Sequence, residues 1–206
     1  MKLMKPDKSA APRRGRPRAF DAETVLDRAL QVFWRKGFDG TSLSDLTRAM
    51  GINRPSIYAA FGDKRALFCK VLDRYAQGPA GFVREALSEP TSRAVVARLL
   101  RAAADMHTDP RGPRGCLMVQ GALAAGGGGT AVRRELIARR AADETMIRKR
   151  LERAKSERDL SADSSPADLA RYVVTVIRGM AVQAAGGASR EELRRVTRMA
   201  LRAWPR

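Results

Sequence analysis

Apolar and polar residues follow a helical period along most of the chain. Between residues 22 and 37 the apolar positions recur at intervals of three or four, which predicts a helix that buries one face. Asp21 stands where a helix cap belongs, and Gly37 stands where a helix ends. We find no convincing run with the period of two that marks a strand, so the pattern predicts an all-α fold. The apolar positions are Val25, Leu26, Ala29, Val32 and Phe33.

The stretch 41–61, TSLSDLTRAMGINRPSIYAAF, holds two short helical patterns with a glycine between them. Thr41 or Ser42 can cap the first helix, and Asn53 can cap the second. Gly51 permits the backbone dihedral angles that turn the first helix steeply onto the second. One longer helix would form more easily, so this break indicates that the second helix is directed at a target. The spacing predicts a helix-turn-helix, with a purely structural pair of helices as the alternative.

Helical patterns continue to the end of the chain, separated by breaks that carry Pro, Gly or Ser-Asp clusters. The run AAGGGG at 124–129 is the strongest breaker. No strand precedes it and no Lys-Ser or Lys-Thr follows it, so we expect a flexible loop and not a phosphate-binding loop. The later helical patterns cover residues 64–77, 91–107, 114–125, 130–155, 166–185 and 189–204.

These patterns divide the chain into three parts. A disordered basic arm is expected at residues 1–18, where basic residues are mixed with Pro, Gly and Ser and no apolar period is present. A small helix-turn-helix domain is expected at residues 19–65, and a larger helical domain at residues 66–206.

The chain is strongly basic, with a net charge of +18 and a pI near 11.2. Such a charge favours nucleic acid as a partner first and an anionic membrane surface second, although an arginine-rich proteome would explain part of it. No apolar run reaches the ~18 residues that span a bilayer, and no signal-peptide core follows the basic N-terminus. We therefore expect a cytoplasmic protein that binds DNA and no membrane.

The residue sets that carry most enzyme chemistry are not found in the sequence. Cys69, Cys116 and the single histidine, His107, have no spacing that forms a disulfide framework or a zinc site. We find no paired catalytic carboxylates and no Ser/His/Asp set, and a lone histidine is most often a surface or packing residue. A helical enzyme is therefore the weaker alternative, and no metal or cofactor is expected.

A family resemblance is carried by VLDRALQVFWRKGFDG together with the following TSLSDLTRAMGINRPSIYAAFGDKRALF. These segments combine a Gly-Phe before the threonine, a glycine turn, a tyrosine in the second helix and the exit Phe-x-Asp-Lys-x-x-Leu. Over residues 20–68 the chain resembles the DNA-binding domain of TetR/AcrR-type transcriptional regulators. Thr47 departs from the alanine that is more common in the family, but its methyl group can fill the same space. Farther on, RGCLMVQGAL resembles a segment of some members.

The resemblance implies a homodimer whose C-terminal helical domain binds a small-molecule effector. Such a regulator is more often a repressor than an activator, and the effector releases it from a palindromic operator. The two recognition helices of a dimer must sit about one DNA turn apart, ~34–36 Å or a multiple, so an effector that favours another spacing shifts the protein off the DNA. The alternative is an architectural protein that binds DNA without sequence specificity and has no effector pocket.

The expected DNA contacts fall in three places. The start of the recognition helix should face bases or phosphates, and Tyr58 can reach a phosphate, pack its ring in the core, or do both. An arm before the first helix should enter the minor groove, unless it is only a solvated tail. Residues near helix N-termini should contact phosphates. These residues are Asn53, Arg54, Pro55, Ser56 and Tyr58 in the helix, Arg16 and Arg18 in the arm, and Thr41, Ser42 and Lys64 at the helix ends.

The last two helices are expected to pair with those of a second copy in a four-helix bundle, as the resemblance implies. A broad apolar face within residues 166–204 supports this pairing, although an amphipathic helix can bury such a face within one chain equally well. The expected interface residues are Leu169, Tyr172, Val173, Val176, Ile177, Met180 and Trp204.

One cysteine has a sequence context that suggests reactivity. Cys116 is expected in or just before the first turn of a helix, close in sequence to Arg111 and Arg114, and helix N-termini and cations both stabilise a thiolate. Some family members sense electrophiles or oxidants with similar segments, so the resemblance also implies a sensing role. The alternative is a buried cysteine that acts as a small hydrophobe. The residues expected to contact or sense the effector are Cys116, Met106 and Met118.

Overall fold

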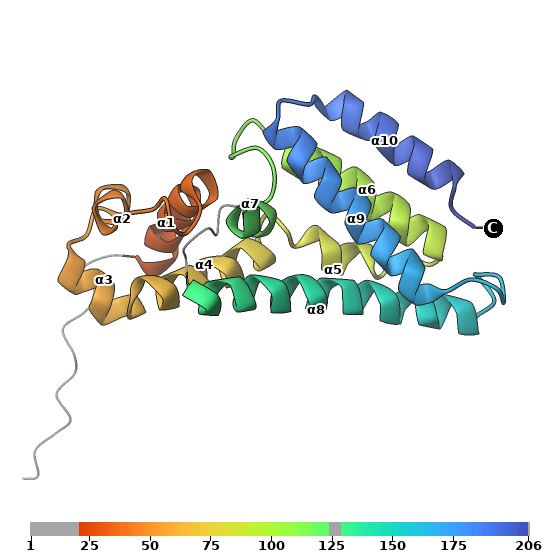
Figure 1. Ribbon diagram of the computed structural model, residues 1–206, viewed down its shortest axis with the longest axis horizontal. Helices are drawn as coiled ribbons and strands as arrows, with labels where there is room; N and C mark the ends of the chain where they lie inside the picture. Colours follow the sequence, from red (N-terminus) through yellow and green to blue (C-terminus); the bar gives the residue numbers. More distant parts are fainter. Residues whose placement is uncertain (1–20, 124–128, 206) are drawn as a thin grey trace, which may run out of the picture.

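The computed structural model describes residues 21–123 and 129–205, and Figure 1 shows how they are arranged. The described residues form ten α-helices and no strand, which confirms the predicted all-α class. The expected arm at 1–18, with Arg16 and Arg18, lies outside them, as does most of the expected loop at 124–129. The helices are α1 (Ala22–Lys36), α2 (Leu43–Met50), α3 (Arg54–Phe61), α4 (Lys64–Gln77), α5 (Phe82–Ala86), α6 (Ser92–His107), α7 (Leu117–Leu123), α8 (Gly129–Ser156), α9 (Pro166–Ala185) and α10 (Arg190–Arg202).

The sequence did not predict α5. This helix has five residues and no side-chain cap at its N-terminus, so neither an apolar repeat nor a capping residue could reveal it. The helix predicted at 114–125 begins at Leu117 instead. Gly115 has a φ of 86°, which lies outside the helical region, and this residue prevents an earlier start.

The N-terminal helices form the expected helix-turn-helix. Ser42 and Asp45 cap the start of α2 reciprocally, and Asn53 caps α3. Gly51 ends α2 in the left-handed conformation, with φ 71° and ψ 22°, which is the role that the sequence predicted for it. Leu46 of α2 is fully buried, and the core therefore fixes the angle between the two helices.

The C-terminal bundle is built from α6, α8, α9 and α10. α9 lies at its centre, because it packs on each of the other three helices (Figure 1). α8 is the longest helix and runs beneath both the bundle and α4, to which it is tied by an ion pair of 2.7 Å between Arg139 and Asp73. None of the described helices combines the length and the apolar character that crossing a bilayer requires.

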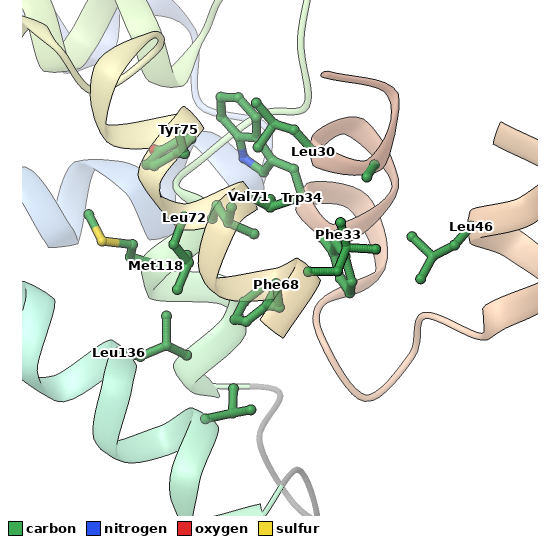
Figure 2. Packing of buried hydrophobic residues seen from close by; sticks show 14 of the residues in the cluster. Leu30, Phe33, Trp34, Leu46, Phe68, Val71, Leu72, Tyr75, Met118 and Leu136 are labelled. Atoms are coloured by element: carbon green, nitrogen blue, oxygen red, sulfur yellow. The ribbon is translucent and has the colours of Figure 1, made fainter. Parts of the chain in front are cut away.

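The buried apolar residues form two clusters. The first begins in α1, α2 and α3 and continues through α4 to α7 and α8, where it includes Met118 and Leu136 (Figure 2). The second lies within the C-terminal bundle and includes Leu99, Val173 and Trp204. The N-terminal helices therefore share one core with α4 and α7, while α8 and α9 contribute residues to both clusters.

Candidate nucleic-acid interface and effector cavity

The start of α3 presents a polar surface to solvent. Ile57 and Phe61 are buried in the first cluster, so the opposite side of this short helix faces outward. This outward side is free to contact another molecule. Its residues are Asn53, Arg54, Pro55 and Tyr58, which are exposed, and Ser56, which is half-buried.

Contacts within the helix pair orient these side chains. Arg54 donates from Nη2 to Oγ of Ser44 in α2 at 3.1 Å, which ties the start of α3 to its neighbour. Oδ1 of Asn53 accepts the backbone N–H of Ser56 at 2.9 Å. Tyr58 is 48% exposed, so its ring lies largely outside the core and its hydroxyl is available for contact with another molecule.

The three residues expected near phosphates lie in different surroundings. Ser42 is exposed at the N-terminus of α2, where an anion can approach the helix end. Lys64 is half-buried with its ammonium 4.3 Å from the centroid of the Phe38 ring, and burial lowers its pKa. Thr41 requires a correction: it is 1% exposed, and its hydroxyl donates to the carbonyl of Gly37 at 2.6 Å. It closes the turn between α1 and α2, so its side chain is not available to DNA.

A small cavity lies between the two apolar clusters. It encloses about 60 Å³, and the first cluster contributes Tyr75, Cys116 and Met118 to its wall while the second contributes Val174. Met106 also lines it, so the structure brings the three residues expected to contact an effector into one cavity. The volume is well below the ~150 Å³ of an engineered cavity that holds benzene. An organic ligand can therefore enter only when the surrounding helices move apart.

A hydroxyl and two sulfur atoms meet at this cavity. The hydroxyl of Tyr75 lies 3.3 Å from Sγ of Cys116 and 3.8 Å from Sδ of Met106. Tyr75 is fully buried, and burial raises its pKa well above the ordinary value, so the hydroxyl keeps its proton and can donate it to one sulfur or the other.

The Cys116 thiol is not held as a thiolate. Burial raises its pKa, and this effect outweighs the hydrogen bond from Tyr75, which lowers it. The two arginines that were expected to stabilise a thiolate are engaged elsewhere: Arg114 donates to the carbonyl of Ala184 at 2.9 Å, and Arg111 pairs with Asp109 at 2.8 Å. The expectation of a cation-stabilised thiolate is therefore corrected, and the resting thiol is neutral at pH 7.

His107 is a buried wall of the same cavity and not a surface residue. It is 1% exposed, and its Nδ1 lies 3.2 Å from the carbonyl of Gly115, so the proton on Nδ1 is donated there. Among the described residues, none forms a hydrogen bond of ordinary geometry with Nε2, and the backbone of Ile177 acts on the ring more weakly. Burial lowers the pKa of His107 to about 4, which makes the imidazole neutral at pH 7. Within the described residues, no group of three His, Cys, Asp or Glu side chains is placed to hold a metal ion.

Charged groups form another part of the cavity wall. Arg140 and Asp143 come from α8, and Arg178 comes from α9. Nη2 of Arg178 donates to the backbone carbonyl of Arg140 at 3.0 Å, which joins the two helices at this point. Burial raises the pKa of Asp143 and lowers that of Arg140. The sequence offered no signal for this grouping, because the three residues are separated by ordinary helical intervals or lie on different helices.

Some residues of the apolar face expected to join two copies are buried within the chain, and others remain partly exposed. Val173, Met180 and Trp204 are at most 3% exposed and pack in the second cluster, and Ile177 lines the cavity. The prediction is corrected for Val173, Met180 and Trp204, because these three side chains are buried within one chain. The other expected residues keep some exposure: Leu169, Val176 and Ile177 are half-buried, and Tyr172 is exposed.

Four large apolar side chains of α9 and α10 are exposed in the structure. Val182 is 48% exposed and Met199 is 68% exposed, which is high for large apolar side chains. Sequence reasoning missed Val182 and Val196, since a helical stripe shows which residues share a face but not which face is covered. These exposed residues, called here the apolar surface of α9 and α10, are Tyr172 and Val182 of α9 with Val196 and Met199 of α10.

Two protein-family models match the chain. The model described as "Bacterial regulatory proteins, tetR family" matches residues 25–71, which span α1 to α3 and the first half of α4. The model described as "Tetracyclin repressor-like, C-terminal domain" matches residues 93–200, which include the bundle and the cavity wall beyond α5.

Individual relatives agree with these matches. The HTH-type transcriptional repressor ComR of Escherichia coli (strain K12) is 32% identical over 194 residues, which are 93% of this chain and 92% of ComR. The HTH-type transcriptional repressor BdcR of the same strain is 38% identical over 109 residues, 52% of this chain and 55% of BdcR. A solved structure of the TetR family transcriptional regulator CifR, a cysteine mutant complexed with a 26bp double-strand operator DNA, superposes with a TM-score of 0.88. It is 43% identical and covers 92% of this chain and 100% of that one.

Proposed function

This chain belongs to the TetR family of bacterial transcriptional regulators, and from that premise we propose that it is a homodimeric repressor released from its operator by a small-molecule effector. The observation that carries the proposal is the exposed polar start of α3 on a helix-turn-helix, because a relative that is 43% identical is complexed with operator DNA. A repressor acts on DNA in the cytoplasm, which is where we expect the protein.

Recognition of the operator uses three parts of the N-terminal region. The start of α3 enters the major groove with Asn53, Arg54, Pro55, Ser56 and Tyr58. Phosphates beside the groove meet Ser42 at the start of α2 and the ammonium of Lys64. Arg16 and Arg18 follow the minor groove.

Two copies pair through the apolar surface of α9 and α10. Charged substitutions would be costly there, because pairing removes Val182 and Met199 from water. Gly179 lies on α9, and no atom lies within 4 Å of the position that a Cβ would occupy. A partner helix can therefore approach the α9 backbone closely at this point. The symmetry of the pair places two α3 helices on one palindromic operator.

The cavity lies where a ligand can move the two clusters apart. On one side, Tyr75 of α4 lines it, and the adjacent Arg74 pairs with Asp27 and Glu23 of α1 at 2.7 and 2.8 Å. A shift of α4 therefore carries α1 with it. On the other side, α9 lines the cavity with Ile177 and carries the pairing surface. A ligand that widens the cavity changes the distance between the two α3 helices and favours the form that has left the DNA.

The proposal is tested with DNA from upstream of the protein's own gene. Footprinting should show two protected half-sites related by a palindrome, and sedimentation should show a dimer in the absence of DNA. Small molecules that raise the melting temperature of the protein should also weaken its binding to this DNA. Protection without defined half-sites would favour the second candidate, an architectural DNA-binding protein, for which the net charge of +18 is the supporting observation.

A further inference from the structure

Two arginines that line the cavity form no close ion pair. Arg140 and Arg178 both line the cavity, and in the part of the chain that the structure describes no carboxylate lies within ion-pair distance of either. The one hydrogen bond between them runs from Nη2 of Arg178 to the backbone carbonyl of Arg140. This bond holds the two residues together without neutralising either charge.

The charges around this pair favour an anion. After burial, the neighbouring Arg178 is the next cause that lowers the pKa of Arg140, so the two cations act on one another. Among the described residues that line the cavity, Asp143 is the acidic one; it acts electrostatically on Arg178 but is not among the charges that act on Arg140. A partly buried cation without a partner costs free energy, and a bound anion removes that cost.

Most of the remaining cavity wall is apolar, although Tyr75, His107 and Asp143 also line it. Met106, Met118, Val174 and Ile177 lie in the wall together with the two arginines, so an apolar group and a charged group of one ligand can both find partners there. Guanidinium groups bind carboxylates in a planar, bidentate geometry that suits a small head group. The cavity of about 60 Å³ limits the size of the hydrocarbon part that can enter before the helices move.

We propose that the effector is a small organic acid whose carboxylate binds between Arg140 and Arg178 and whose apolar part lies among Met106, Met118 and Ile177. The inference rests on the proposed function, since it names the chemical class of the ligand for the same cavity. It explains why charged side chains from α8 and α9 are joined at a cavity that both apolar clusters line. A carboxylate there bridges the two helices from inside.

The inference is tested by binding of acids and their neutral counterparts to the full-length protein. Butyrate and benzoate are compared with butanol and benzyl alcohol by calorimetry and by thermal unfolding. We expect the acids to bind at least about tenfold more tightly than the alcohols, a difference of ~1.4 kcal/mol. Equal binding of acids and alcohols, or no effect of either acid at millimolar concentration, would overturn the inference.

Matched variants locate the site. Arg140→Gln and Arg178→Gln should each weaken binding of the acids by about tenfold and leave binding of the alcohols unchanged. Arg148→Gln on α8 and Arg171→Gln on α9 remove the same charge from exposed positions outside the cavity and should bind the acids as the wild type does. Asp143→Asn should tighten acid binding, because it removes a like charge. If Arg148→Gln or Arg171→Gln loses acid binding to the same extent, the effect is only that of net charge and the proposed site is wrong.

Release of operator DNA separates this inference from the proposed function. An acid that binds through Arg140 and Arg178 but leaves the DNA complex intact supports the site and contradicts the effector mechanism. A neutral ligand that binds the cavity and releases the DNA supports the mechanism and overturns the organic acid. Both measurements use the same protein and the same operator fragment.

Discussion

The ring of Trp34 in α1 stands edge-on to the ring of Tyr75 in α4, with centroids 4.9 Å apart and planes at 87° (Figure 2). The hydroxyl at the far end of Tyr75 lies 3.3 Å from the thiol of Cys116. One aromatic pair therefore connects the N-terminal helices with the wall of the cavity. A ligand that displaces Tyr75 must also change the position of Trp34.

The Trp34–Tyr75 pair should be energetically coupled. Replacing either ring by Leu removes buried contacts and should destabilise the protein by several kcal/mol. The double variant should lose ~0.5–1.5 kcal/mol less than the sum of the single losses, because the edge-to-face contact is counted in both. Urea unfolding of the four proteins measures this difference. Trp34→Leu with Trp204→Leu is the control, since these residues lie in different clusters and their effects should add. If the losses for Trp34 and Tyr75 are additive, the two rings are not energetically coupled.

Arg54→Ala should weaken binding to the operator by ~1–3 kcal/mol if the guanidinium reads a base. Binding to scrambled DNA of the same length should change much less. Ser44→Ala is the matched variant, because it removes only the group that orients Arg54 and should cost less. Fluorescence anisotropy on both DNA fragments measures the effect. Equal losses on operator and scrambled DNA would mean that Arg54 contacts only the phosphate backbone.

The stability of the protein should fall in mild acid because of His107. Its pKa is about 4 in the folded protein and ~6.5 in an unfolded chain, so below pH 6.5 the unfolded state binds a proton that the folded state does not. The free energy of unfolding should therefore decrease by roughly 2 kcal/mol between pH 7 and pH 5 from this residue alone. His107→Asn can still donate to Gly115 and does not titrate, so its stability should change less over the same range. Urea unfolding measures the stability of both proteins at each pH. If the wild type and His107→Asn lose the same stability between pH 7 and pH 5, His107 is not the cause of the loss.

Cys116 should react slowly with iodoacetamide in the folded protein at pH 7, because the buried thiol is neutral and only the thiolate is nucleophilic. Urea should expose it and speed the reaction. Cys116→Ser should then keep the response of DNA binding to a non-covalent ligand, with Cys69→Ser as the control. The opposite role, a sensing cysteine, would be supported if an electrophile modified Cys116 in the folded protein and released the DNA while Cys116→Ser stayed bound.

Val182→Asp or Met199→Asp should give folded monomers with weak operator binding, because each places a charge in the proposed pairing surface. Val173→Asp provides the contrast: it buries a charge in the second cluster and should unfold the protein. Sedimentation velocity gives the oligomeric state, and circular dichroism gives the helical content. A folded dimer in both surface variants would place the interface elsewhere.

The sequence predicted the N-terminal helices well because their signals are local. Asp21, Ser42 and Asn53 each cap the helix that follows them, and Gly51 takes the left-handed conformation that ends α2. A cap acts over three residues, so one sequence is enough to read it. The position of Thr41 was harder, because a threonine before a helix can cap it or, as here, bond backward to Gly37.

The cavity and the pairing surface depend on contacts between distant residues. Arg178 and Arg140 are brought together by the packing of α8 on α9. The spacing of residues within either helix does not predict this contact. Val173 and Val182 lie in one apolar helix, yet one is buried and the other is exposed, because α9 has neighbours within the chain on only part of its circumference. Such facts follow from tertiary structure and not from a periodic pattern.

The placement of the cavity between two separate apolar clusters has a consequence for how this protein can diversify. Each cluster buries its own leucines, valines and aromatic rings, and a half-buried side chain packed against a cluster contributes less to stability than one inside it. Substitutions at Met106, which is half-buried in the cavity wall, can therefore reshape the ligand site at a smaller cost in stability than substitutions inside either cluster. The helix-turn-helix, whose core lies in one cluster, can keep its geometry while the lining of the cavity is exchanged. Selection for a new ligand can thus proceed one residue at a time without passing through an unfolded intermediate.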